Sequence, residues 1–108
     1  MERERPVPRH REIVRATCPP DAANCRAATG RIVYLERVDP DGDGDLHLVV
    51  LGGSVTGPGF TVLDVSKDVR PRRDPRIGDL ASGAGPVYAG SVGQRQIQVT
   101  ELHLLRRR

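Results

Sequence analysis

The most concentrated set of possible ligand atoms lies in an acidic loop, where residues 39–45 read Asp-Pro-Asp-Gly-Asp-Gly-Asp. Alternate aspartates followed by Gly44 match the start of a calcium-binding loop, in which carboxylates converge on the ion. Position twelve of such a loop is Val50 instead of glutamate, so a calcium ion would also need backbone carbonyls or a distant acid such as Asp64. The alternative is a solvated hairpin loop in which Asp and Gly serve turn geometry. The candidate calcium ligands are Asp39, Asp41, Asp43 and Asp45.

Basic side chains form a second group after residue 65. Arginine recognises phosphate in a planar, bidentate manner, so these residues are candidates for nucleic-acid binding. They are Lys67, Arg70, Arg72, Arg73, Arg76 and Arg95. Proteins that bind single strands usually add exposed aromatic rings for base stacking. Tyr34 and Tyr88 are the candidates for that role, because Phe60 is expected in the core. The alternative is a solvated, arginine-rich loop.

The two cysteines, Cys18 and Cys25, are separated by six residues. This spacing is too long for a C-x-x-C redox motif, and no further cysteine supports a zinc site. A local disulfide, which indicates an oxidising compartment, and two free thiols both remain open. A disulfide closing so short a loop would stabilise the fold by about 2–3 kcal/mol.

Other catalytic patterns find little support in the sequence. His10, His47 and His103 are scattered, and His47 is expected to be a half-exposed structural histidine on a strand. No Gly-x-Ser-x-Gly elbow and no phosphate-binding glycine loop before a helix occur. The expectation is a protein that is not an enzyme.

The 108 residues allow one domain, and the net charge of +3 is unevenly distributed. Residues 39–65 contain five Asp and no Lys or Arg, whereas the flanking parts are basic. No apolar run approaches the roughly 20 residues that a membrane-spanning helix needs. The first residues lack a signal-peptide pattern, so we expect either a cytoplasmic protein or a chain whose targeting segment was removed. The oligomeric state stays open.

The elements that must position these groups are short strands. Glycine (12) and proline (9) are abundant, which fits many strands joined by tight turns. β-branched and apolar runs predict five strands, at residues 31–38, 46–51, 60–65, 84–92 and 95–104. Gly85-Pro86 is expected to interrupt the fourth, and residues 66–79 are expected to form a crossing loop with one helical turn.

The predicted domain plan has four parts. Residues 1–17 form a flexible charged N-terminal arm, 18–29 a cysteine-bracketed leader loop, 30–105 the β domain and 106–108 a basic tail. Five strands with a longer connection between the third and fourth is the plan of the OB fold. The sequence therefore predicts an all-β, five-stranded OB-like Greek-key barrel with little or no helix.

Two stretches resemble known OB-fold proteins. Pro75-Arg76-Ile77-Gly78-Asp79 followed by Gly85-Pro86-Val87-Tyr88 resembles the entry to strand four of that fold. Residues 30–35 and 43–48 resemble its opening hairpin. Over residues 30–105 the chain is thus similar to small, mostly uncharacterised bacterial OB-like domains, a likeness that does not fix a function.

A further resemblance concerns a hydrolase. The triplet Asp43-Gly44-Asp45 is similar to one in staphylococcal-nuclease-like enzymes, which also use an OB-type barrel. Leu46 follows the triplet where that family has Thr, and the family's downstream Arg-containing and Pro-Glu-containing segment is not found.

These observations define three functional expectations. The first is a non-enzymatic OB-like binding module for nucleic acid. The second is an exported, disulfide-bonded domain, steadied by calcium, that binds a protein or a glycan. The third is a nuclease-like hydrolase. Apart from calcium, no cofactor is expected.

Overall fold

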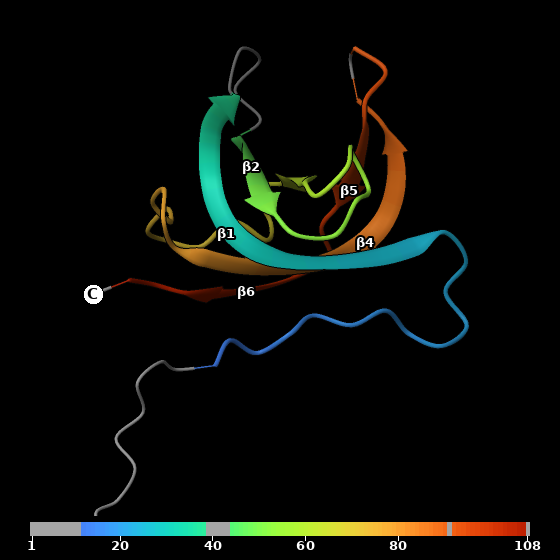
Figure 1. Cartoon of the computed structure of the whole chain (residues 1–108), viewed down its shortest axis with the longest axis horizontal. Coiled ribbons are helices and arrows are strands. Elements are labelled where there is room, and N and C mark those ends of the chain that lie inside the picture. Colours follow the sequence, from blue (N-terminus) through green and yellow to red (C-terminus); the bar gives the residue numbers. More distant parts are fainter. Residues whose placement is uncertain (1–11, 39–43, 91, 108) are drawn as a thin grey trace, which may run out of the picture.

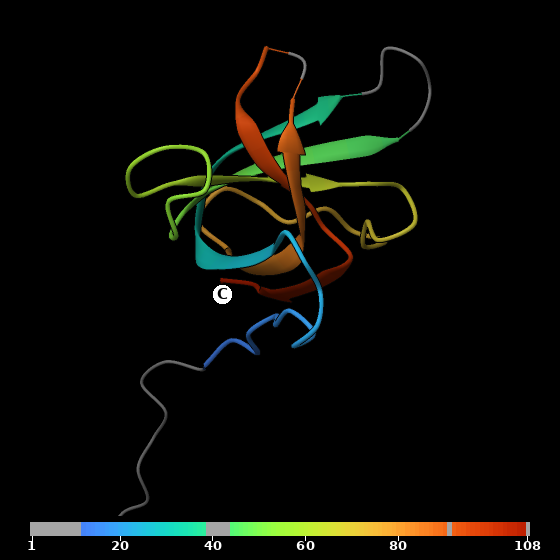
Figure 2. The same cartoon turned by 90° about the vertical axis from the view of Figure 1, so that its right-hand side faces the viewer.

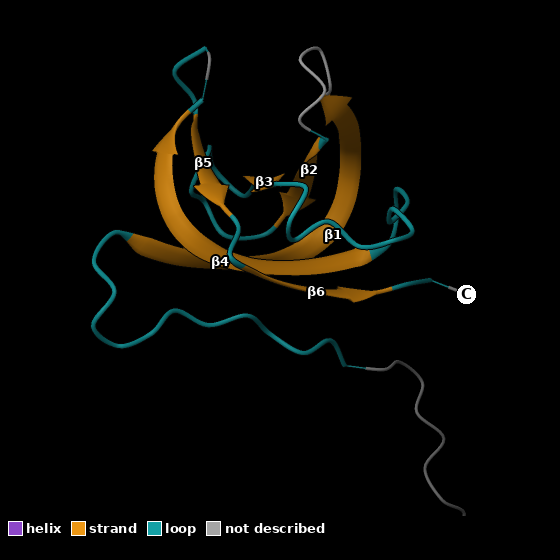
Figure 3. Ribbon diagram, turned by 180° about the vertical axis from the view of Figure 1, so that it is seen from behind, coloured by secondary structure: helices purple, strands orange, loops and turns teal. Residues whose placement is uncertain are grey.

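The computed structural model of the chain describes residues 12–38, 44–90 and 92–107. Within that part the protein is all-β, with strands and loops but no helix (Figure 3). No helix in these residues is therefore long and apolar enough to cross a membrane. The strands are β1 (Cys25–Val38), β2 (Asp45–Leu51), β3 (Thr61–Val65), β4 (Leu80–Ala89), β5 (Arg95–Gln98) and β6 (Glu101–Leu105).

The six strands form one sheet that closes in a ring. Neighbouring strands follow the order β1-β2-β3-β5-β4-β6, and β1 also pairs with β4. All pairings are antiparallel except β3 with β5, which is parallel. In Figure 1 the long strands β1 and β4 curve upward like the two sides of a U, with β2, β3 and β5 between them.

Glycines allow the strong curvature of these two long strands. β1 changes partner from β4 to β2 at Arg31, and a bulge follows between Ile32 and Tyr34. A Cβ on Gly30 would lie 2.1 Å from the Leu51 carbonyl oxygen, and one on Gly85 would lie 1.9 Å from that of Gln98. Such close backbone approach excludes any side chain at these two bends.

The core fills the ring from alternate positions of each strand. β2 alternates buried and half-buried residues, with Leu46, Leu48 and Val50 fully buried. They pack with residues such as Ile32 of β1 and Leu63 of β3. This alternation is typical of a sheet with one face in the core, and it directs the intervening side chains to the outside of the ring.

The predicted strands were largely correct in position but not in extent. β1 begins at Cys25 rather than residue 31, and β4 spans Leu80–Ala89 without the expected interruption at Gly85-Pro86. The predicted fifth strand is divided into β5 and β6. At the division, Val99 N donates to the Asp64 carbonyl of β3, while Thr100 N donates to the Ala84 carbonyl of β4.

The segment before β1 is held against the outside of the sheet. Cys18 and Cys25 form a disulfide with an S–S distance of 2.09 Å, so the local bond is present rather than two free thiols. Ala16 is buried, and its N–H donates to Ser82 Oγ of β4 at 2.8 Å. Figure 2 shows this segment below β6, outside the ring. Residues 1–11 of the predicted arm lie outside the described residues.

The connection between β3 and β4 crosses from one end of the ring to the other. It contains the expected single turn, in which Arg70 N donates to the Ser66 carbonyl at 2.9 Å. Its middle is anchored by Asp74, whose carboxylate accepts hydrogen bonds from Arg70 and from Arg37 of β1. At the end of the connection, just before β4, the Asp79 carboxylate accepts hydrogen bonds from the backbone N–H groups of Arg76 and Arg107.

Candidate functional site

Polar and aromatic side chains gather on the outside of the ring, across five neighbouring strands. The β1–β2 register pairs Glu36 with His47, and the β2–β3 register pairs His47 with Asp64. The β4–β5 register places Tyr88 opposite Gln96. We call this surface the outer polar face and define it by Tyr34, Glu36, His47, Asp64, Tyr88 and Gln96.

Asp64 lies at the centre of a hydrogen-bond network on this face. The Tyr88 hydroxyl donates to Asp64 Oδ2, and Gln96 Nε2 donates to the Tyr88 hydroxyl oxygen at 2.8 Å. Gln94 Nε2 extends the chain of hydrogen bonds to Gln96 Oε1 at 2.9 Å. The network therefore connects β3, β4, β5 and the turn between β4 and β5.

His47 completes the network from β2. Its Nε2 lies 3.3 Å from Asp64 Oδ1, and both side chains are largely shielded from solvent. Oδ1 is buried, and no well-oriented hydrogen-bond donor from the described residues reaches it. The imidazole is therefore the nearest source of positive charge for this oxygen, and the interaction strengthens when His47 is protonated.

The network shifts three pKa values. Interaction with the Asp64 carboxylate raises the pKa of His47 above 6.5, against the opposing effect of burial. Burial by itself raises the pKa of Asp64, but the interactions with His47 and Tyr88 outweigh it and leave that pKa below 3.8. Burial and the neighbouring Asp64 raise the pKa of Tyr88 to about 12. At neutral pH, Asp64 is thus a carboxylate and Tyr88 a neutral donor.

The two tyrosines of the chain are both on the outer polar face. Tyr34 pairs with Val49 of β2 and is 54% exposed, whereas Tyr88 is 37% exposed even though its hydroxyl is bound. β2, β3 and β5 lie between them in the ring. Two aromatic rings are therefore accessible at either side of a hydrogen-bonding centre. These are the two residues that the sequence indicated for stacking.

Acidic groups dominate the charge around this face. Glu36 is exposed, and the negative charges of Glu36 and Asp45 both add to the raised pKa of His47. Asp45 also contributes to the raised pKa of Tyr88. Arg95, at the start of β5, is the predicted basic residue that belongs to a strand of this region, and it is exposed. The surface is therefore poorly suited to a polyanion.

The other predicted basic residues lie on the β3–β4 connection. Arg70 is occupied, because Nε and Nη2 bind Asp74 and Nη1 donates to the Gly44 carbonyl. Lys67, Arg72, Arg73 and Arg76 are exposed. Arg73 and Arg76 line a pocket together with the C-terminal segment, apart from the two tyrosines. The structure thus places the predicted basic residues and aromatic rings on separate elements, and only Arg95 belongs to a strand that pairs with one of the tyrosine strands, β4.

Of the predicted calcium ligands, Asp39, Asp41 and Asp43 lie outside the described residues. Asp45 is the first residue of β2 and is half-buried. Among the described residues, no group of three or more His, Cys, Asp or Glu side chains could hold a metal ion. The calcium hypothesis therefore stays a prediction.

No sequence pattern indicated His47 or Gln96 as a site residue. Asp64 was predicted only as a possible distant ligand of a calcium ion. Alternation around Leu46, Leu48 and Val50 does direct His47 outward, so its face was predictable. The partner of His47 was not predictable, because the register between β2 and β3 determines that His47 lies opposite Asp64.

Comparison of the chain with models of protein families and with curated proteins gives no match. The functional conclusion therefore depends on the geometry of the site itself.

Proposed function

We propose that the protein is a non-enzymatic binding module that holds an uncharged oligosaccharide on its outer polar face. The observation that carries the proposal is the combination of two exposed tyrosines with a hydrogen-bonding network on the outside of the ring, on the strands that lie between the two tyrosines. Tyr34 and Tyr88 offer ring faces for stacking, while His47 and the Tyr88 hydroxyl offer polar atoms beside them. Sites for small polar ligands commonly combine these two features.

An OB-like barrel is part of this proposal. A ring in the order β1-β2-β3-β5-β4, with parallel β3 and β5, fits such a barrel with β6 as an addition. Proteins of that fold bind oligonucleotides and oligosaccharides on the face of strands 2 and 3 and on the loops beside it. His47 and Asp64 occupy the corresponding strands here.

Charge favours the oligosaccharide over the oligonucleotide on this face. Glu36, Asp45 and Asp64 would repel a phosphate backbone, whereas carboxylates accept hydrogen bonds from sugar hydroxyls. The Cys18–Cys25 disulfide points in the same direction, because such bonds persist in the oxidising compartments where glycans are abundant. Both observations agree with the second functional expectation from the sequence.

Tyrosine fluorescence provides a direct test, since the chain has no Trp and its two Tyr residues both lie on the outer polar face. The probes are cellohexaose, maltohexaose and N-acetylchitohexaose, followed by calorimetry for the dissociation constant. We expect saturable binding of at least one sugar, and we expect Tyr34→Ala to weaken it about tenfold. Val92→Ala is the matched control, because Val92 is exposed but lies in the β4–β5 turn.

Three outcomes of these titrations would contradict the oligosaccharide proposal or replace it. Absence of saturable binding for all three sugars would contradict the proposal. Binding of a thymidine oligonucleotide that is lost in Tyr34→Ala would replace it with a nucleic-acid function on the same face. Binding of an Arg/Lys-rich peptide that depends on Glu36 would replace it with a protein-binding function.

Nucleic acid is the second candidate, and a different observation favours it. Lys67, Arg72, Arg73 and Arg76 are exposed on one connection and could contact phosphates. Binding of an oligonucleotide that weakens with salt and with Arg72→Gln, Arg73→Gln and Arg76→Gln together would support this candidate. Retention of full binding in that triple variant would exclude it.

A further inference from the structure

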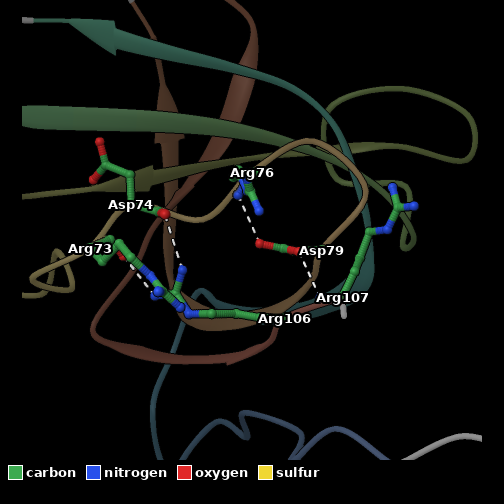
Figure 4. A pocket seen from close by; sticks show the side chains of 6 residues that line it. All are labelled: Arg73, Asp74, Arg76, Asp79, Arg106 and Arg107. Carbon is green, nitrogen blue, oxygen red and sulfur yellow. Dashed lines mark hydrogen bonds between the residues drawn. The ribbon is translucent and has the colours of Figure 1, made fainter.

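An arginine-lined pocket of about 260 Å³ lies between the β3–β4 connection and the segment after β6 (Figure 4). We call it the arginine pocket. None of its residues belongs to the outer polar face, so it is a separate feature of the molecule. It is lined by Arg73, Asp74, Arg76, Asp79, Arg106 and Arg107.

The two carboxylates of this pocket are already hydrogen-bonded. Asp74 accepts from Arg70 at 2.9 and 2.8 Å and from Arg37 at 2.9 Å, both outside the lining. Figure 4 shows its carboxylate turned away from Arg106. Asp79 accepts from the backbone N–H groups of Arg76 and Arg107, at 2.8 Å each. The ion pairs of Asp74 are thus with Arg37 and Arg70, outside the lining, and Asp79 is bound by two backbone N–H groups.

The pocket consequently has an excess of positive charge. Its lining contains four arginines and two aspartates, and Arg37 and Arg70 add two positive charges behind Asp74. Within the described part of the chain, the guanidinium groups of Arg73, Arg76 and Arg107 form no ion pair with an acid. Their planar donor groups match the geometry of a tetrahedral oxyanion.

Arg106 gives the pocket a fixed wall. Its Nη1 donates to the Asp74 carbonyl at 3.0 Å and its Nη2 to the Arg73 carbonyl at 2.6 Å. These bonds attach the C-terminal segment to the β3–β4 connection. They also hold a positive charge beside the pocket. The site is thus partly organised before any ligand binds.

We propose that the arginine pocket binds a phosphate group. The ligand is inorganic phosphate or the phosphate of a small ester, held by Arg73, Arg76 and Arg107 against the wall formed by Arg106. Its binding would join two segments that are remote in sequence. The inference is independent of the oligosaccharide proposal, because it uses none of the residues of the outer polar face.

The test compares two pocket variants with a control variant of equal charge loss by titration with inorganic phosphate at low salt. Arg73→Gln and Arg76→Gln are each compared with Arg72→Gln, since Arg72 is exposed on the same connection but does not line the pocket. We expect saturable binding to the wild type, weakened about tenfold in Arg73→Gln or Arg76→Gln and within about twofold of wild type in Arg72→Gln. Backbone amide NMR shifts provide the readout.

Three arms identify the source of the phosphate. Inorganic phosphate, glycerol phosphate and phosphatidylglycerol vesicles are compared on the same variants. Binding of the first two with the expected variant pattern supports the proposal as stated, whereas binding of vesicles alone overturns the small-ligand assignment. Equal weakening in all three variants would indicate general charge attraction and would overturn the pocket. Absence of saturable phosphate binding would also overturn it.

Discussion

The outer polar face and the arginine pocket treat charge in opposite ways. On the outer polar face, one buried carboxylate of β3 is surrounded by an imidazole, a phenol and an amide from three other strands. In the arginine pocket, both carboxylates are satisfied by donors outside the lining or by backbone N–H groups, and the exposed side chains of Arg73, Arg76 and Arg107 form no ion pair with an acid among the described residues. The outer polar face therefore holds polar side chains in fixed positions around one carboxylate, whereas the arginine pocket has an excess of positive charge.

This difference concerns stability as well as recognition. Asp64 is 5% exposed, so its partners cannot easily be replaced by water. The Asp74 side chain is 17% exposed, and one of its partners, Arg37, is 61% exposed. Ion pairs near solvent contribute little, whereas a buried polar group that loses its partner is costly. Substitutions should therefore separate the two regions by the size of their effect.

The largest expected effect is that of removing Asp64. Asp64→Ala should lower the free energy of unfolding by about 2–3 kcal/mol, because Tyr88, Gln96 and His47 lose a shared buried acceptor. Asp74→Ala should cost about 1 kcal/mol, since Arg37 and Arg70 regain water. Urea denaturation measures both. Equal costs, or a larger cost for Asp74→Ala, would contradict the comparison; Asp64→Asn provides the same test if the alanine variant does not fold.

The second prediction concerns the ionisation of Tyr88. In Tyr34→Phe, Tyr88 is the sole tyrosine, and its phenol should ionise at about pH 12. Adding Asp64→Asn should move this ionisation toward 10, because one cause of the raised pKa is removed while burial remains. Tyrosinate absorbance, with circular dichroism to confirm the fold, measures the shift. An unchanged titration in the double variant would show that Asp64 does not hold the phenol.

The sequence predicted more of the strands than of their pairings. Residues 46–51 and 60–65 were correctly assigned, because β-branched and apolar residues dominate there. The first six residues of β1, from Cys25 to Gly30, were missed because Ala and Gly are depleted in strands and Thr29 is the one β-branched residue among them. Their extended structure comes from pairing with β4, which is a tertiary contact that no local pattern contains.

The same limit applies to the sites. The exposed tyrosines and the arginine-rich connection were predictable from residue type. The Asp64 network and the arginine pocket were not, since both depend on register and on contacts between remote segments. Arg106 shows this well: it was predicted as part of a basic tail, and its guanidinium binds carbonyls of the β3–β4 connection.

The third prediction is a pH dependence on the outer polar face. Because the pKa of His47 is raised in the folded protein, the stabilisation by its protonated imidazole is complete below about pH 6.5. This stabilisation is lost as the pH rises through the raised pKa. Because the pKa of Asp64 is lowered in the folded protein, the stabilisation by its carboxylate is complete above about pH 3.8. This stabilisation is lost as the pH falls through the lowered pKa. The pair therefore stabilises most between these limits.

His47→Gln tests this window. It should cost about 1 kcal/mol at pH 5–6 and much less at pH 9, as measured by urea denaturation at each pH. Asp74→Ala is the contrast, because its arginine partners keep their charge and its cost should not decline over that range. A cost of His47→Gln that stays constant from pH 5 to 9 would argue against the charged pair.

The smallest expected effect belongs to Arg37. Arg37→Gln should lower the free energy of unfolding by no more than about 0.5 kcal/mol, because its contact with Asp74 is exposed and Arg70 still binds the carboxylate. The effect should decrease further in high salt. A loss as large as that of Asp64→Ala would mean that the two regions are not different in kind.

The most direct test of the central claim is amide NMR mapping of the wild-type protein with two ligands in turn. Inorganic phosphate should shift the amides of Arg76, Asp79 and Arg107 and leave those of His47, Asp64 and Gln96 in place. An oligosaccharide that binds should produce the reverse pattern. If both ligands shift the same set of amides, or if phosphate shifts the outer polar face, the protein does not have two separate recognition surfaces.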